Sequence, residues 1–151
     1  MFDPVRKKEV AHTPEEEVRQ MLVAHLHTEC GAPYTLMCCE YAFKAGRKTF
    51  RADLVLFDRK GQPLLLAECK APSIPINRSV FEQIMKYNKL LKVPYLLLTN
   101  GTESYLCRYY PQENRFEALT QIPAFIDMIH STKISTFVSN LQHEYGGNGI
   151  S

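Results

Sequence analysis

The sequence predicts an α/β protein, equally describable as α+β, in which a mixed central sheet is flanked by helices. Three observations carry this prediction: a capped helix start near Thr13, three strand-like apolar runs up to residue 70, and a second helical pattern followed by two further runs. The predicted element order is α-β-β-β-α-β-β-α. With 151 residues, 45% of them hydrophobic and 23% charged, the chain has the composition of an ordinary globule. We predict a single domain over residues 1–145 and a flexible tail over 146–151.

The first helix begins at a capping signal. Thr13 is a good N-cap, Pro14 suits the first helical position, and Glu16 completes a capping box. Gly31 then ends the helix. The apolar stripe expected to face the core comprises Val18, Met21, Leu22 and Leu26.

Three strands follow, over residues 36–43, 51–57 and 64–70. The last two are separated only by the turn-like segment 58–61, so they read as a hairpin. All three should therefore form an antiparallel meander.

The register of that hairpin decides which charges meet. If Lys60-Gly61 forms a two-residue turn, residues whose numbers sum to 121 lie opposite one another, and Asp53 faces Glu68. A three-residue loop would instead place Asp53 opposite Ala67, on the wrong face, unless a bulge restored the register.

The second half of the chain reads as a helix between two strands. The helix cap is Ser79, with a capping-box glutamate three residues later, or alternatively Asn77. The apolar run 94–99 is typical of a buried strand, and a crossover through the helix makes it parallel to 64–70. The helix face expected to pack on the sheet comprises Val80, Ile84, Tyr87 and Leu91.

The remaining elements follow from turn signals. Asn100-Gly101 predicts a turn, with residues 105–110 as the partner strand of a hairpin. A short helix is expected near residues 123–130.

The third strand ends in an unusual set of charges. Residues two apart on a strand share a face, so Glu68 and Lys70 project together while Cys69 turns away. If Asp53 lies opposite Glu68, the two carboxylates repel unless a cation lies between them. Mg²⁺ is a suitable ion, and an amine beside it completes an arrangement that can hydrolyse a phosphodiester. Solvated strand-end charges are the simpler interpretation, but charges next to strands buried on both faces are costly unless paired or bound to metal.

The net charge and the cysteine content exclude few functions. A net charge of +2 argues neither for nor against nucleic acid, and the five cysteines without a CxxC motif favour a reducing compartment. No apolar run approaches the roughly 20 residues of a membrane span, and residues 1–9 lack a signal-peptide stretch, so we expect a cytoplasmic protein with no membrane partner. Three basic groups could meet phosphates: Arg6-Lys7-Lys8; Arg47-Lys48 with Arg51; and Lys86, Lys89 and Lys92.

This pattern resembles the PD-(D/E)xK nuclease superfamily, whose restriction-endonuclease-like core is α-β-β-β-α-β. Within it, residues 13–110 look like the N-terminal nuclease region of the type I restriction enzyme R subunit. One departure is Ala52, which stands where the motif's name has proline before the catalytic aspartate. The resemblance rests on Thr13-Pro14-Glu15-Glu16 with Val18-Arg19-Gln20, Arg51-Ala52-Asp53, Glu68-Cys69-Lys70-Ala71-Pro72, Gln83 with Tyr87, and Thr99-Asn100-Gly101.

The resemblance implies a metal site for Mg²⁺ or Mn²⁺. Asp53 and Glu68 would ligate the ion, and the Cys69 backbone carbonyl could supply a further ligand. An acidic residue on the first helix often joins such sites, and Glu16 is the choice here, with Glu17 second. Glu40 is a further possible contributor.

The resemblance also implies three catalytic side chains besides the carboxylates. Lys70 would orient or activate the attacking water and offset transition-state charge. Gln83 and Tyr87 match a Gln-x-x-x-Tyr motif of related DNA-processing enzymes, and at one helical turn apart they can share a face.

The function expected from this resemblance is a metal-dependent endonuclease that cleaves DNA, alone or with restriction or repair subunits. The chain has no GxxxxGK[ST] motif, so it is not itself a P-loop translocase. The alternative is a catalytically silent nuclease-like module that binds nucleic acid or a protein partner, and a regulatory protein without a nucleic-acid role is a third reading.

Overall fold

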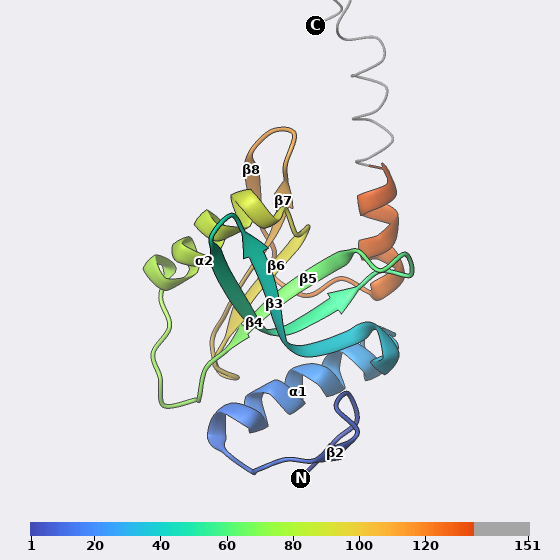
Figure 1. Ribbon diagram of the computed structural model, residues 1–151, viewed down its shortest axis with the longest axis vertical. Helices are drawn as coiled ribbons and strands as arrows, with labels where there is room; N and C mark the ends of the chain where they lie inside the picture. Colours follow the sequence, from blue (N-terminus) through green and yellow to red (C-terminus); the bar gives the residue numbers. More distant parts are fainter. Residues whose placement is uncertain (135–151) are drawn as a thin grey trace, which may run out of the picture.

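The computed structural model describes residues 1–134, so the tail predicted at 146–151 lies outside the described residues. Figure 1 shows a central sheet with helices on its two faces. In chain order the elements are β1 (Phe2–Asp3), β2 (Lys8–Glu9), α1 (Pro14–Thr28), the 3₁₀ turn η1 (Tyr34–Leu36), β3 (Met37–Ala45), β4 (Lys48–Phe57), β5 (Pro63–Cys69), α2 (Arg78–Leu91), β6 (Tyr95–Thr99), β7 (Ser104–Tyr110) and β8 (Arg115–Ala118). Residues 125–134 are helical.

The main sheet is six-stranded and mixed, as predicted. Its order is β3-β4-β5-β6-β7-β8, and β5 pairs with β6 in parallel while the other neighbours are antiparallel. The parallel pair confirms the crossover through α2. The two-stranded β1-β2 sheet and the edge strand β8 were not predicted, because segments of two and four residues carry too little periodicity to recognise.

Two hydrophobic clusters lie on opposite faces of this sheet. The first joins α1 and the 125–134 helix to one face, through residues such as Leu26, Leu54 and Met128. The second joins α2 to the other face, through Phe81 and Ile84 with Leu66, Leu96 and Leu98. Neighbouring residues of β6 therefore belong to different clusters, and this central strand is buried on both faces as its continuous apolar run predicts.

Both predicted helix faces were partly wrong. Met21 is exposed on α1, and Val80 is exposed on α2, where Phe81 occupies the core position instead. The faces are rotated because the core also receives groups that a hydrophobic pattern does not anticipate. On α1 these groups include Glu16 and Arg19, both buried.

The N-terminal caps of α1 and α2 were predicted only in part. The Thr13 hydroxyl accepts from the Glu16 N–H at 3.1 Å, as expected, and Pro14 is the first helical residue. The Glu16 carboxylate does not return to Thr13 to close the box, however, since it binds arginines instead. On α2 the cap is Asn77, which accepts from the Val80 N–H at 2.9 Å, so the Ser79 alternative was wrong.

The β4–β5 connection has the predicted register but not the predicted turn. The Asp58 N–H donates to the Gln62 carbonyl at 2.8 Å, closing a longer loop than Lys60-Gly61 alone. The ladder starts from Phe57 opposite Pro63 and shifts by one residue between Leu56 and Phe57. This bulge restores the pairing whose residue numbers sum to 121, including Leu54 opposite Ala67. Asp53 and Glu68 follow this pair as its neighbours.

The β6–β7 turn packs against α1 through Gly101. Its φ of +88° suits glycine, and a Cβ built there would meet Val18 Cγ2 at 3.3 Å. Asn100, beside it, is buried and anchors the segment after β5 by donating from its amide to the Ile74 carbonyl at 3.0 Å. The turn thus joins α1 to the segment that follows β5.

We expect Gly101→Ala to lower the free energy of unfolding by about 2 kcal/mol, since it combines backbone strain with crowding against Val18. Gly46→Ala is the matched control, because Gly46 also has a positive φ of +64° but open space around its Cβ. Urea unfolding of both variants measures the difference. An equal loss in the two variants would contradict close packing at Gly101.

Candidate active site

The candidate site lies where β4 and β5 stop pairing through their backbones. The last pair is Leu54 opposite Ala67, and beyond it side chains bridge the two strands. The Asp53 N–H donates to Glu68 Oε1 at 3.3 Å, and the Cys69 N–H donates to Asp53 Oδ2 at 2.7 Å. Each carboxylate is therefore anchored on the strand opposite its own, and the predicted Asp53–Glu68 apposition is present.

The two carboxylates interact unfavourably. Burial, and then the negative charge of Asp53, raise the pKa of Glu68 to about 8, although the Asp53 N–H and the charge of Lys70 oppose the shift. A cation between the two side chains would remove this cost.

Lys70 and Cys69 flank the site as alternation on β5 predicts. The Cys69 thiol packs into the α1-side core, where burial raises its pKa, while Lys70 is half-buried and its charge acts on Glu68. The Lys70 N–H donates to the Thr99 carbonyl at 2.9 Å, which extends the parallel ladder past the end of β5. Within residues 1–134, no hydrogen bond or ion pair holds the Lys70 ammonium.

The donor set fits a hard divalent cation that keeps most of its waters. No group of three or more His, Cys, Asp or Glu side chains forms a metal cluster within the described part of the chain. Mg²⁺ is commonly bound by one or two carboxylates together with water and substrate phosphate, and Asp53 with Glu68 matches that requirement. A carboxylate has several acceptor positions, so the bond from Cys69 leaves Asp53 able to ligate.

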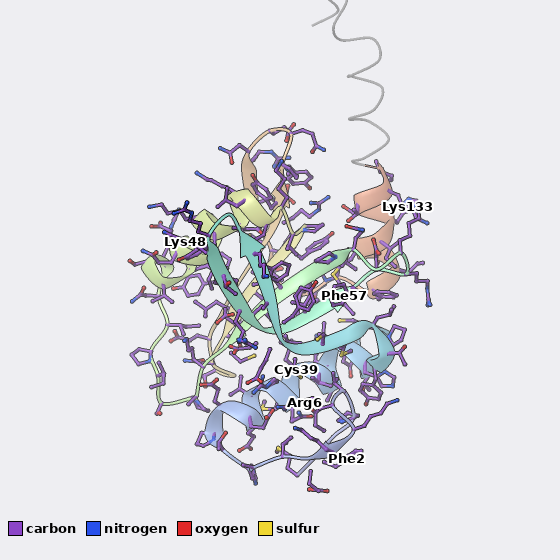
Figure 2. The ribbon with its side chains drawn as sticks, in the orientation of Figure 1. Phe2, Arg6, Cys39, Lys48, Phe57 and Lys133 are labelled. Carbon is purple, nitrogen blue, oxygen red and sulfur yellow. The ribbon has the colours of Figure 1, made fainter. Side chains whose placement is uncertain are left out.

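The structure places Glu16 in a buried ion-pair network rather than in a cluster with Asp53 and Glu68. Its carboxylate accepts from Arg6 and from Arg19 Nε at 3.0 Å. Hydrogen bonds from Arg6 and Gln20, with the charge of Arg19, lower the pKa of Glu16 although burial alone would raise it. Figure 2 shows Arg6 at the junction between the N-terminal hairpin and α1. The metal-ligand role of Glu16 stays a prediction.

Gln83 and Tyr87 lie on α2, on the other face of the sheet from α1. Gln83 is exposed, and the Tyr87 ring lies 5.1 Å from the Phe50 ring of β4, measured between centroids. Within residues 1–134 no hydrogen bond joins either side chain to Asp53, Glu68 or Lys70. Their catalytic roles also stay predictions.

Two of the three predicted basic groups are exposed near one another. The Phe50–Tyr87 contact places the β3–β4 hairpin beside α2, and both elements carry exposed cations. In the N-terminal group Lys7 and Lys8 are exposed, but Arg6 is paired with Asp3 and Glu16 and is not free to meet phosphate. The exposed cations on the hairpin, on α2 and at the C-cap of α2 are Lys44, Arg47, Lys48, Arg51, Arg78, Lys86, Lys89 and Lys92.

A cavity of about 580 Å³ lies at the other end of β5 and contains none of the predicted site residues. It is bordered by the β4–β5 loop and the end of α2, and its lining includes Leu64, Leu91 and Val93. This cavity is therefore separate from the candidate site at the strand end.

The α-β-β-β-α-β frame with its mixed sheet is a nuclease-like fold. The sequence matches the family described as type I restriction enzyme R protein N terminus over residues 14–123. The chain belongs to that family, as the resemblance predicted.

One solved structure shares the fold. A fragment described as a putative HsdR subunit of a type I restriction enzyme from Vibrio vulnificus YJ016 has a TM-score of 0.55 at 20% identity. That match covers 76% of this chain and 25% of the other, so this chain spans about a quarter of that fragment. A protein from Anabaena variabilis ATCC 29413, described as a putative nuclease of DUF820, has a TM-score of 0.49 at 15% identity, covering 79% of this chain and 77% of that one. No curated protein sequence matches the chain.

Among the described residues, no helix is both long and apolar enough to cross a membrane.

Proposed function

We propose that this domain is a Mg²⁺-dependent endonuclease that hydrolyses DNA phosphodiester bonds. The observation that carries the proposal is the pair of facing carboxylates, Asp53 and Glu68, with Lys70 beside them at the end of β5. Membership of the R-protein N-terminus family supports the same reaction class. Mn²⁺ would serve in place of Mg²⁺, since both accept carboxylate and water ligands.

Each residue has a proposed role that its position supports. Asp53 and Glu68 would hold the cation, with the Cys69 carbonyl as a further ligand. The bound ion would polarise the scissile phosphate and lower the pKa of a bound water. Lys70, whose ammonium makes no hydrogen bond or ion pair among residues 1–134, would orient the attacking water and offset charge on the phosphorane-like transition state.

DNA is the proposed substrate, and Gln83 with Tyr87 would contribute from α2. The exposed cations of the β3–β4 hairpin and α2 support contact with a phosphate backbone. Because the family is that of a type I restriction enzyme R protein, we also propose that the chain works with other restriction or repair subunits, which would supply sequence recognition.

We expect Lys70→Ala to lower the rate of Mg²⁺-dependent DNA cleavage by about 10²–10³-fold, the usual effect of removing one charged donor to a transition state. The assay uses linear and circular DNA, single- and double-stranded, with Mg²⁺ or Mn²⁺. Lys60→Ala, at the opposite end of β5 in the exposed β4–β5 loop, is the control and should cleave like the native protein.

Two outcomes would count against the proposal. Equal cleavage by the native and Lys70→Ala proteins would mean that this site does not perform the reaction. Absence of cleavage by the native protein, combined with salt-sensitive DNA binding, would favour the silent binding module.

A further inference from the structure

A network of four charges, three of them buried and the fourth, Arg6, partly exposed, joins the N-terminal hairpin to α1. Asp3 is fully buried, and Glu16 and Arg19 are 6% and 7% exposed. Arg6 donates to both Asp3 and Glu16, and Arg19 donates to Glu16 through Nε at 3.0 Å. Two guanidinium groups thus balance two carboxylates, which is the condition under which charges tolerate burial.

Arg19 also extends this network to the candidate site. Its Nη1 donates to the backbone carbonyl of Asp53 at 3.2 Å, while Nε and Nη2 face the Glu16 carboxylate at 3.0 and 3.4 Å. A planar guanidinium can serve two acceptors at fixed angles, which a lysine amine cannot reproduce.

The Asp53 backbone needs such support because the sheet is interrupted on both sides of it. The β4–β5 pairs end at Leu54. The β3–β4 pairs pass from Leu54 to Ala52, skipping Asp53, where the opposing Glu40 adopts a φ of +54°. Arg19 therefore holds the one residue of β4 at which neither neighbouring ladder continues.

We infer that Arg19 is a positioning residue that fixes Asp53 for metal binding, and that Glu16 acts by orienting Arg19. This inference rests on the proposed function, since it assigns Asp53 a bound cation. It explains why an acidic residue on α1 lies near the site without joining Asp53 and Glu68 in a metal cluster.

The first test measures Mn²⁺ binding directly, by electron paramagnetic resonance of the protein without DNA. Arg19→Met should weaken Mn²⁺ binding by about 10–100-fold, the usual effect of removing a group that orients a ligand. Arg19→Lys should fall between the native protein and Arg19→Met. Arg115→Met, which removes an exposed arginine on β8, is the control and should bind as the native protein does.

Glu16→Gln separates orientation from ligation. The amide oxygen can still accept from Arg19, so Mn²⁺ affinity should fall by less than about tenfold. A loss as large as that of Asp53→Asn would overturn the inference, because it would make Glu16 a ligand.

The Arg19→Met protein would keep two buried carboxylates with only one arginine, and this excess negative charge could prevent folding. A double variant keeps the test valid in that case. Glu16→Gln with Arg19→Met removes one charge of each sign and still removes the bond to Asp53. Native near-ultraviolet circular dichroism with weakened Mn²⁺ binding supports the inference, and native spectra with unchanged binding overturn it.

Failure of the proposed function would look different. If the native protein binds no Mn²⁺, or if Asp53→Asn binds it as tightly as the native protein, the metal site itself is wrong. If Asp53→Asn loses Mn²⁺ but every folded Arg19 variant keeps it, the site stands and Arg19 has no positioning role.

Discussion

Asp53→Asn is expected to lower Mg²⁺-dependent DNA cleavage by at least about 10³-fold while the fold remains intact. Lewis-acid stabilisation by a bound metal is worth several kcal/mol, and each 1.36 kcal/mol of barrier is a factor of ten in rate. The fold should survive because the asparagine amide oxygen can still accept from the Cys69 N–H, which lies 2.7 Å from Asp53 Oδ2.

Single-turnover cleavage at saturating Mg²⁺ measures this effect, beside urea unfolding of the same protein. Asp127→Asn, an exposed change in the 125–134 helix, serves as the control and should leave cleavage unchanged. Cleavage by Asp53→Asn within tenfold of the native rate would remove Asp53 from the site.

The second large effect is a pH dependence of stability that originates at Glu68. Its pKa is raised to about 8 in the folded protein, chiefly by burial and by the charge of Asp53, from a usual value of 4.5. Between these two pH values the folded state holds a proton that the unfolded state has lost. In the absence of metal, this carboxyl therefore stabilises the fold at low pH, and the contribution is lost as pH rises from about 4.5 to about 8.

Glu68→Gln removes that titration and isolates it from the rest of the protein. We expect the metal-free native protein to lose stability relative to Glu68→Gln across this window, with a slope of at most about 1.4 kcal/mol per pH unit. Asp3 and Glu16 act in the opposite sense, since their pKa values are lowered, but they are common to both proteins and cancel in the difference.

Urea unfolding from pH 4.5 to 8.5, with and without Mg²⁺, measures the slope. Added Mg²⁺ should reduce it, because ion binding favours the ionised carboxylate and releases its proton. Parallel stability curves for the native protein and Glu68→Gln would show that Glu68 is not perturbed in the way its burial implies.

Much of the architecture was predictable because it rests on periodic apolar patterns. The strands of the meander, the crossover through α2 and the buried strand β6 all have runs that favour one structure. The Asp53–Glu68 apposition was also predictable, although for an incomplete reason: the turn is longer than Lys60-Gly61, and a bulge between Leu56 and Phe57 restores the register. Bulges depend on tertiary packing and leave little trace in sequence.

The polar support of the site was harder to predict. Glu16 was explained locally as half of a capping box, whereas its carboxylate binds two arginines, one of them from the N-terminal hairpin. The i, i+3 spacing of Glu16 and Arg19 on one helix was the available signal. The bond from Arg19 to Asp53, 34 positions later, depends on the packing of α1 against the sheet, which no local pattern encodes.

At the site, side-chain hydrogen bonds replace backbone pairing between β4 and β5. Two backbone amides can therefore report on the site in a spectroscopic measurement. The amide protons of Asp53 and Cys69 each point at a carboxylate oxygen of the candidate site and not at a carbonyl of a strand. Their nuclear magnetic resonance frequencies consequently depend on the ionisation and ligation of those carboxylates. Occupancy of the site can thus be observed in the native chain, without a probe, a substrate or a substitution.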